Sequence, residues 1–510
     1  MLALHERTLS HSIRRLARTY REAAIWQQLA VLAVPLLVYA LTQTTWVLAG
    51  TAIALGILFT LRLDLGLLLI VFTIPFAFTY KQIGGDIVSL VEMLTLVCLI
   101  AWAARNVGTF KRSNVLTFQR PNALDWGVIF FVAVAIASLL VAEDLDTARW
   151  ELRILIIEPA LLYLMVRSGD RGMAVGQDRP EISLRATTRL PLKEAGPPQA
   201  AQTEADPVLC LADALIAGAV VVSAVGLYQY IFTDYVEAVE GVRRILSLYD
   251  SPNHLSLYLG RVIPISVCLA AFGVTRWRRI VHGLALIPLV LCLYLTYSRG
   301  AWLLGLPAVL IFIGLMRGRW GKILALGGLA AALLALVPVL RTPRIATLLT
   351  LQSGTNFLRL VLWEGTARMI AANPIFGVGL GNFMRHYPRY MLPEGGHERV
   401  VFHPHNLLLD TWTSLGIPGL AALAWIQVAF FRLGLQVYRR LMDEPELQAL
   451  TLGLMASMVS FLAHGLVDTG FRLTDLAFVF MLTLGIVRNL GTMTGEPSQS
   501  QRHCNQESLV

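Results

Sequence analysis

Long apolar runs separated by short polar segments recur along the whole chain. Most runs are about 17 to 25 residues long, which is enough for a helix to cross the roughly 30 Å hydrocarbon core of a bilayer. A bilayer core tolerates only helices or closed barrels, and these runs are continuous rather than alternating, so we expect helices. The pattern predicts fourteen spans, at residues 25–41, 45–61, 64–79, 86–104, 123–141, 150–167, 208–231, 254–273, 279–297, 300–316, 322–340, 405–431, 447–467 and 473–489.

The polar segments divide the chain into five parts. Residues 1–24 form a basic N-terminal segment, and residues 25–167 hold the first six spans. Residues 168–207 are rich in Pro, Gly, Ala and mixed charge, a composition that does not bury a core and predicts a disordered loop. Residues 208–490 hold the remaining spans, and residues 491–510 form a polar tail that we also expect to be disordered.

Composition supports the same class of protein. Hydrophobic residues make up 56% of the 510 residues and charged residues only 15%, whereas a soluble domain has about 25% charged residues. The fold class is therefore an all-α polytopic integral membrane protein with about 12–14 transmembrane helices. The net charge of +9 would suggest nucleic acid binding in a soluble protein, but here we assign it to basic cytoplasmic loops and expect no nucleic acid partner. The five cysteines form no CxxC pair, so they indicate neither a metal site nor a redox site.

Loop charge predicts the orientation of the chain in the membrane. Short loops rich in Arg and Lys stay in the cytoplasm, and the N-terminus is expected there too. This places residues 341–402 outside, as a large extracytoplasmic loop that carries short amphipathic helices. The basic inside loops are residues 105–120, 275–279, 317–322 and 435–446, and the neutral to acidic outside loops are residues 142–148 and 468–475.

The loop at residues 341–402 contains seven arginines, three glutamates and no lysine. Arginine binds phosphate through two parallel hydrogen bonds, so an all-arginine loop favours a phosphate-bearing ligand. Arg359 and Trp363 lie four residues apart on one face of a predicted amphipathic helix at the outer membrane surface. Such arginines are also common as plain surface anchors.

Histidines follow this loop, at the entrance to a span. His405 is a candidate general base, because a neutral imidazole at pH 7 is the usual group that deprotonates a hydroxyl. A structural histidine at a helix entrance is the alternative. His403 and His405 also have the spacing of two zinc ligands, but the sequence shows no third and fourth ligand with convincing spacing.

Three further features are candidates for the same face. Arg299 lies at the outer junction of two spans, where an arginine is either functional or extends its side chain to the headgroups. Asn253 and Asp468 lie at outer span ends, where a carboxylate orients an imidazole or forms a plain ion pair. The glycines at 377–381 resemble a nucleotide-binding fingerprint, but no strand precedes them, so we interpret them as a tight turn.

Five segments, in this order and spacing, resemble the O-antigen ligase and O-antigen polymerase superfamily of bacterial envelope glycosyltransferases. The resemblance covers roughly residues 209–490, and the N-terminal spans carry no motif of the family. The chain departs from the family in its span count, above the usual dozen or so, and in residues 168–207, which look like an insertion. The matching segments are DSPNHLSLYL (250–259), YSRGAWL (297–303), RLVLWEGTARMIAANPIFGVGLGNF (359–383), HPHNLLLDTWTSLGIPGL (403–420) and HGLVDTGF (464–471).

The resemblance implies a metal-independent enzyme without a cofactor. It would transfer a glycan, with inversion, from a polyprenyl (undecaprenyl) diphosphate carrier to an acceptor hydroxyl on the outer face of the cytoplasmic membrane. On the matching positions, Arg299 and Arg359 would bind the donor diphosphate, and His405 would deprotonate the acceptor. The supporting residues would be His403, Asn406, Asp468 and Asn253.

The acceptor stays open at this point. A lipid A core would make the chain a ligase, another repeat unit a polymerase, and a protein hydroxyl a protein O-oligosaccharyltransferase. A transporter or flippase for the same lipid-linked glycan is the competing class, and it would place cations along a path through the bilayer. The cations of this sequence gather at the outer edge, which favours the enzyme.

Overall fold

The computed structural model describes residues 15–83, 86–113, 120–168, 206–239, 241–337, 354–393 and 401–494. Most of the N-terminal segment, the loop at 168–207 and most of the tail at 491–510 lie outside these residues. So do three of the seven arginines of the loop, Arg341, Arg344 and Arg399. The proposed division into domains therefore stays a prediction.

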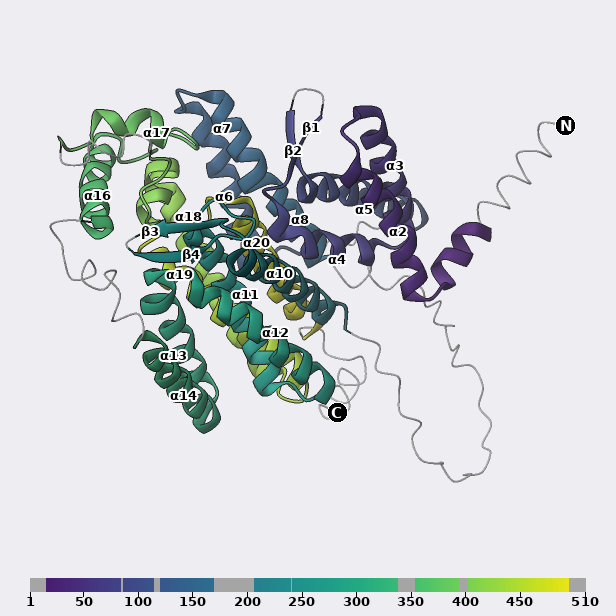
Figure 1. Ribbon diagram of the computed structural model, residues 1–510. Coiled ribbons are helices and arrows are strands. Elements are labelled where there is room, and N and C mark those ends of the chain that lie inside the picture. Colours follow the sequence, from purple (N-terminus) through teal and green to yellow (C-terminus); the bar gives the residue numbers. More distant parts are fainter. Residues whose placement is uncertain are drawn as a thin grey trace, which may run out of the picture.

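The chain is mostly helical, which confirms the predicted class (Figure 1). Its first half contains α2 (Ile25–Leu41), α3 (Thr45–Leu61), α4 (Leu63–Thr73), β1 (Tyr80–Ile83), β2 (Asp86–Ser89), α5 (Leu90–Ser113), α6 (Ala123–Ala137), α7 (Leu145–Glu151) and α8 (Glu158–Arg167). Its second half contains α10 (Pro207–Phe232), β3 (Val236–Val239), β4 (Val242–Ile245), α11 (Pro252–Phe272), α12 (Arg276–Leu295), α13 (Leu306–Met316), α14 (Gly318–Leu336), α16 (Gly354–Ala372), α17 (Phe383–His386), α18 (Leu407–Arg440), α19 (Pro445–Gly465) and α20 (Thr474–Met493).

Short elements join or extend several of these helices. Turns of 3₁₀ helix follow α4 and α6, and π-helical turns precede α8 and α13. Two antiparallel hairpins, β1–β2 and β3–β4, are the sheets of the described chain. Each hairpin connects apolar helices, so neither adds a layer to the bundle.

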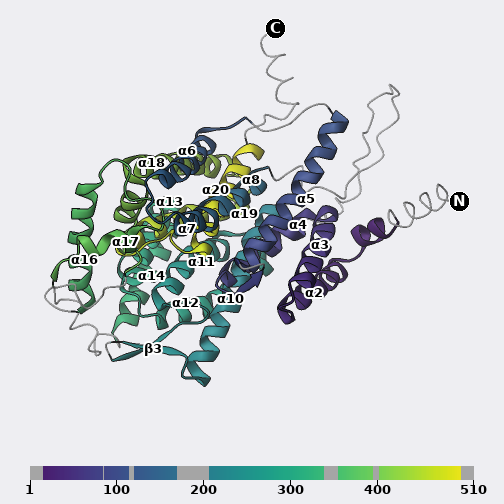
Figure 2. The same ribbon diagram turned by 90° about the horizontal axis from the view of Figure 1, so that it is seen from above.

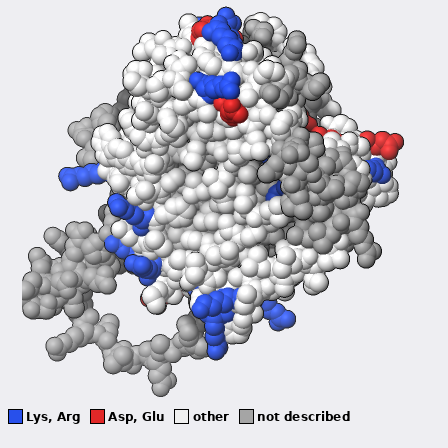
Figure 3. Space-filling model, turned by 90° about the vertical axis from the view of Figure 1, so that its left-hand side faces the viewer, with Lys and Arg blue, Asp and Glu red and all other residues white. Residues whose placement is uncertain are grey.

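Every predicted span overlaps a helix, but fewer helices are long enough to cross a membrane. Eight helices in the described residues have the required length and composition, or nine if the bent pair Arg15–Glu22 and Ile25–Leu41 is one span. Three more apolar helices, Thr45–Leu61, Leu63–Phe76 and Ala301–Met316, are shorter. The predicted number of 12–14 exceeds this count because hydropathy locates apolar runs but does not measure the helix that each run forms. In Figure 3 the middle of one face is broad and largely uncharged, and charged side chains lie around its edges; an uncharged surface of this kind suits contact with lipid.

The centre of the bundle is formed by helices from the end of the chain. In the most apolar stretch of α20, 83% of the residues are buried inside the protein, whereas in that of α14 only 11% are buried. Helix α20 is therefore central and α14 peripheral. Helix α20 packs against α8 and α18, and α19 packs against α11. Seen from above, α19 and α20 lie between α2–α3 on one side and α16 on the other (Figure 2).

A buried cluster of charges ties the two halves of the chain together. The carboxylate of Asp125 on α6 accepts hydrogen bonds from Tyr163 and Arg167 on α8 and from Arg488 on α20. Buried charges are tolerated when they are paired and hydrogen-bonded, and the carboxylate and both arginines meet that condition. The N-terminal helices, which carry no family motif, are therefore part of the same core.

Helix α18 breaks at Gly416, and this break positions the polar segment that precedes it. Gly416 has φ +67°, and a Cβ there would overlap the carbonyl oxygen of Ile375. The amide of Ile417 donates to Ile375 O at 3.0 Å, and Val378 N donates to Thr413 O at 2.7 Å. The glycines at 377, 379 and 381 all have positive φ, which confirms the predicted tight turn, and the turn lies on the break in α18.

Candidate functional site

The segment before α18 holds His405 in a defined position. His405 has φ +48°, a left-handed conformation that is uncommon outside glycine. The next residue, Asn406, caps α18 by accepting from the amides of Leu408 and Leu409 and donates its side-chain amide to Leu466 O at 2.8 Å. Asn406 therefore fixes the turn to the end of α19, which accounts for its place in the motif without a chemical role.

His405 and Asp468 form an imidazole–carboxylate pair. Nδ1 of His405 lies 3.0 Å from Oδ1 of Asp468, in the loop between α19 and α20. The His405 side chain is 33% exposed and that of Asp468 only 2%, so solvent or substrate reaches the imidazole but not the carboxylate. Burial by itself raises the pKa of Asp468, but the hydrogen bond with His405 and the charge of Arg359 hold it well below its usual range. Asp468 is thus a carboxylate that orients the ring.

Arg359 on α16 faces the same carboxylate. Its Nη2 atom lies 3.7 Å from Oδ2 of Asp468, and its side chain is 24% exposed. One turn later, Trp363 donates its indole N–H to Pro404 O at 2.9 Å. The predicted common face of Arg359 and Trp363 therefore packs toward the histidine segment.

Arg299 approaches from the turn between α12 and α13. Its Nη1 atom lies 3.4 Å from the side-chain oxygen of Asn356, which precedes Arg359 by three residues on α16. The neighbouring Gly300 lies against His464 of α19, where a Cβ would overlap the imidazole ring. The amide of Asp468 in turn donates to His464 O at 3.2 Å. The structure thus brings Arg299, which is distant in sequence, to the end of the bundle that holds the His405 pair.

His403 lies beside His405 but has a different environment. The two rings are 4.3 Å apart in a T-shaped arrangement, and Nδ1 of His403 accepts from the amide of His405 at 3.3 Å. Burial and the nearby His405 ring hold the pKa of His403 well below its usual range. His403 is therefore a neutral imidazole.

His403, His405 and Asp468 also meet the geometric condition for a cation site. One ligand atom from each residue lies within 4.8 Å of the other two. The sequence alone showed two histidines and no third ligand, because Asp468 is 63 residues away from His405. No other such group occurs among the described residues.

Asn253 is placed elsewhere. Its side-chain oxygen accepts from Arg244 at 2.7 Å, and Arg244 also pairs with Glu237 at 2.7 Å and donates to Thr296 O at 2.8 Å. Asn253 therefore supports the hairpin β3–β4 against the turn that leads to Arg299. It has no contact with the histidine pair among the described residues.

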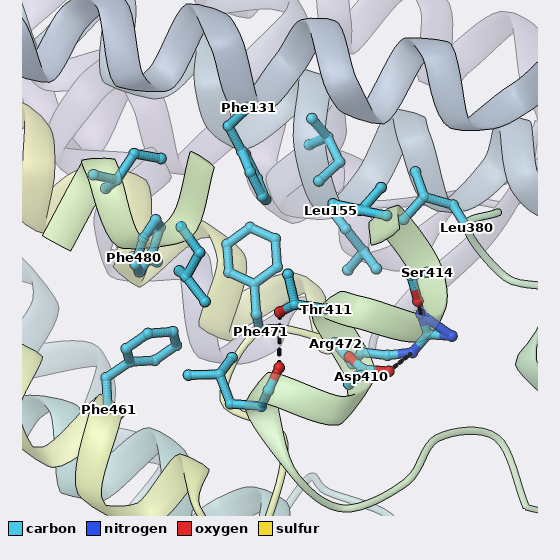
Figure 4. Close-up of a pocket in the computed structure, with 15 residues that line it drawn as sticks. Phe131, Leu155, Leu380, Asp410, Thr411, Ser414, Phe461, Phe471, Arg472 and Phe480 are labelled. Carbon is cyan, nitrogen blue, oxygen red and sulfur yellow. Dashed lines mark hydrogen bonds and ion pairs between the residues drawn. The ribbon is translucent and has the colours of Figure 1, made fainter. Parts of the chain in front are cut away.

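A buried ion network behind the site was not predicted from the sequence. Arg472, four residues after Asp468, pairs with Glu151 of α7 at 3.0 Å. It also pairs with Asp410 of α18 at 3.6 Å (Figure 4). Its second Nη atom lies 3.5 Å from Phe402 O, next to His403. Burial by itself lowers the pKa of Arg472, but the charges of Asp410 and Glu151 outweigh burial and raise the pKa above its usual value. The arginine therefore stays charged.

The same network also reaches the carboxylate of the site. Thr469 donates its hydroxyl to Asp410 at 3.1 Å and its amide to Asp468 at 2.9 Å. Beside the network lies a cavity of about 40 Å³ with mostly apolar walls, among them Phe131, Phe471 and Phe480 (Figure 4). A cavity of this size holds water but no glycan, so the network serves to position residues.

Comparison with known families identifies one part of the chain. Residues 283–424 match the family model described as O-antigen ligase. The matched segment begins in α12, ends in α18 and includes Arg299, Arg359 and His405, whereas Asp468 lies beyond it. A search of curated proteins finds no match for this chain.

Proposed function

We propose that this multi-pass membrane protein, which carries an O-antigen ligase domain over residues 283–424, transfers a glycan from a polyprenyl diphosphate carrier to an acceptor hydroxyl. Members of this family are membrane glycan transferases of the ligase and polymerase type. The observation that carries the proposal is the pairing of an accessible imidazole, His405, with a buried carboxylate, Asp468, beside the Arg359 guanidinium.

The imidazole supplies the base. Because Nδ1 of His405 faces Asp468, its Nε2 atom remains for the substrate, and the carboxylate favours the tautomer with the proton on Nδ1. The acceptor hydroxyl gives its proton to Nε2 while its oxygen attacks the anomeric carbon. Asp468 then stabilises the imidazolium that forms, as a buried carboxylate does in other base–carboxylate pairs.

The arginines supply the leaving-group site. As the glycosyl–oxygen bond breaks, its electron pair goes to the polyprenyl diphosphate, and the negative charge grows on the phosphate oxygens. Arg359 and Arg299 offer planar donors that suit these oxygens and stabilise the charge where it develops. Direct attack on the opposite face of the sugar gives inversion. These side chains perform the reaction without a metal ion.

The charge of the short loops supports an orientation in which this end of the bundle lies on the outer face of the cytoplasmic membrane. Lipid-linked glycans would then reach the site from the bilayer, and the acceptor would reach it from the exterior. Ligation to a lipid core is the function we favour. Polymerisation of repeat units and transfer to protein hydroxyls use the same donor and the same site, so the acceptor distinguishes these functions.

The test uses the full-length protein in liposomes with a lipid-diphosphate glycan and candidate acceptors, with and without EDTA. We expect release of polyprenyl diphosphate with one acceptor class, unchanged by EDTA. A His405→Ala variant should fold and lose nearly all activity, whereas His386→Ala, on α17 of the same polar segment, should stay active. Movement of the intact donor across the bilayer without release of the diphosphate would instead identify a flippase.

A further inference from the structure

We propose that His403, His405 and Asp468 form a reversible binding site for a transition-metal ion such as Zn²⁺, and that the bound ion blocks the general base. The blocking effect rests on the function proposed above, whereas the binding does not. The site combines two imidazoles with one carboxylate, and one ligand atom of each residue lies within 4.8 Å of the others.

The donor set determines which ions the site accepts. Imidazole nitrogen suits Zn²⁺, Cu²⁺ and Ni²⁺, whereas Mg²⁺ and Ca²⁺ prefer sites made of oxygen. Zinc holds nitrogen and oxygen ligands at about 2.0–2.2 Å, so small side-chain rotations close the observed spacing.

The surroundings explain why the ion would exchange rather than reside permanently. Arg359 lies 3.7 Å from Asp468 and repels a cation. Thr469 N already donates to Asp468 Oδ1, which competes with a metal bond. The His405 side chain is 33% exposed, so an ion enters and leaves through solvent. Three ligands with an adjacent guanidinium therefore indicate a site of moderate affinity.

The consequence for catalysis follows from the shared atoms. A neutral imidazole has one nitrogen lone pair, so an ion bound to His405 through either ring nitrogen leaves no lone pair to accept the proton of the acceptor hydroxyl. The ion also engages the carboxylate that would stabilise the imidazolium. The protein would thus work without a metal and be inhibited by zinc, two properties that are measured separately.

The first experiment measures binding. Untagged purified protein is titrated with ZnCl₂ by calorimetry, and MgCl₂ serves as the control ion. We expect one Zn²⁺ per chain in the wild type and in His386→Gln, with no binding of Mg²⁺. Loss of an outer-shell partner lowers metal affinity by roughly 10- to 100-fold, and His403 would be a direct ligand. In His403→Gln the affinity for Zn²⁺ should therefore fall by at least this factor. No binding in the wild type, or unchanged binding in His403→Gln, would overturn the site.

A second measurement avoids any folding defect of the variant. The electron paramagnetic resonance spectrum of Cu²⁺ bound to the wild type should show coupling to two imidazole nitrogens. Coupling to one or no nitrogen would overturn the site.

The third experiment measures inhibition in the liposome assay. Zn²⁺ should inhibit the wild type, and half-inhibition of His403→Gln should need at least tenfold more zinc, relative to its own activity without zinc. Loss of wild-type activity on removal of a bound metal would overturn the inhibitory role, because the ion would then be a cofactor. If no acceptor supports activity at all, the proposed function fails, while the calorimetric titration still decides the metal site.

Discussion

Replacing Asp468 by asparagine tests the imidazole–carboxylate pair directly. The change keeps the shape of the side chain and removes its charge. Two unit charges 3.0 Å apart interact by about 5 kcal/mol at an effective dielectric constant of 20. Because His405 is one-third exposed, solvent screening leaves about half of this, or roughly 2–3 kcal/mol.

This energy is the stabilisation that the imidazolium would lose in the transition state. At 1.36 kcal/mol for each factor of ten, kcat should fall roughly 30- to 150-fold. The KM for the donor should change little, because in our proposal the diphosphate is bound by Arg359 and Arg299 and not by Asp468. The assay is the initial rate of polyprenyl diphosphate release in liposomes, measured over a range of donor concentrations.

The chain contains a matched control for this variant. Asp250 also pairs with a histidine, His254, at 2.6 Å, but its side chain is 74% exposed. Asp250→Asn should keep kcat within about twofold of the wild type, since solvent screens the exposed carboxylate of Asp250. If Asp468→Asn stays within about threefold of the wild type, Asp468 does not support the base and the reasoning fails.

The remaining predictions concern the phosphate site, the buried network and the break in α18. Arg359→Lys should lower kcat/KM about tenfold or more although the charge is kept, because lysine lacks the planar pair of donors; equal kinetics would remove the bidentate role. Arg472→Gln should destabilise the protein by about 3–5 kcal/mol, because two buried carboxylates lose their partner; an unchanged Tm in detergent would contradict this. Gly416→Ala should lower the Tm and the activity together, because the new Cβ overlaps the Ile375 carbonyl in a backbone conformation that favours glycine; Ala422→Gly, further along the same helix, should lower the Tm only slightly.

The sequence alone determined the class of the protein and the position of its helices. Apolar runs are local features, so the predicted span at 25–41 matches α2 and that at 45–61 matches α3. Because an apolar run is a local feature, it does not always show which type of element the chain forms. The run predicted at 86–104 begins as strand β2 and continues as α5 to Ser113, because hydropathy does not distinguish a short apolar strand from a helix.

The sequence also identified the residue types of the site, since arginine for phosphate and histidine for a base are chemical preferences. The tertiary structure decided how they meet. Asp468 is 63 residues from His405, and only the packing of α19 against α18 and of α16 against the histidine segment brings Arg359 and Asp468 to the ring. For the same reason, the sequence alone does not show that Asp468 is a third possible ligand of a metal ion.

The buried residues behind the site depended on tertiary structure even more. Glu151, Asp410 and Arg472 lie in three separate elements, and nothing in the spacing of a charged residue along the chain shows which buried partner it will face. Pairing in a helical bundle follows from which helix faces pack together, and that is a property of the whole fold. The sequence therefore determined which groups were present, and the fold decided which of them act together.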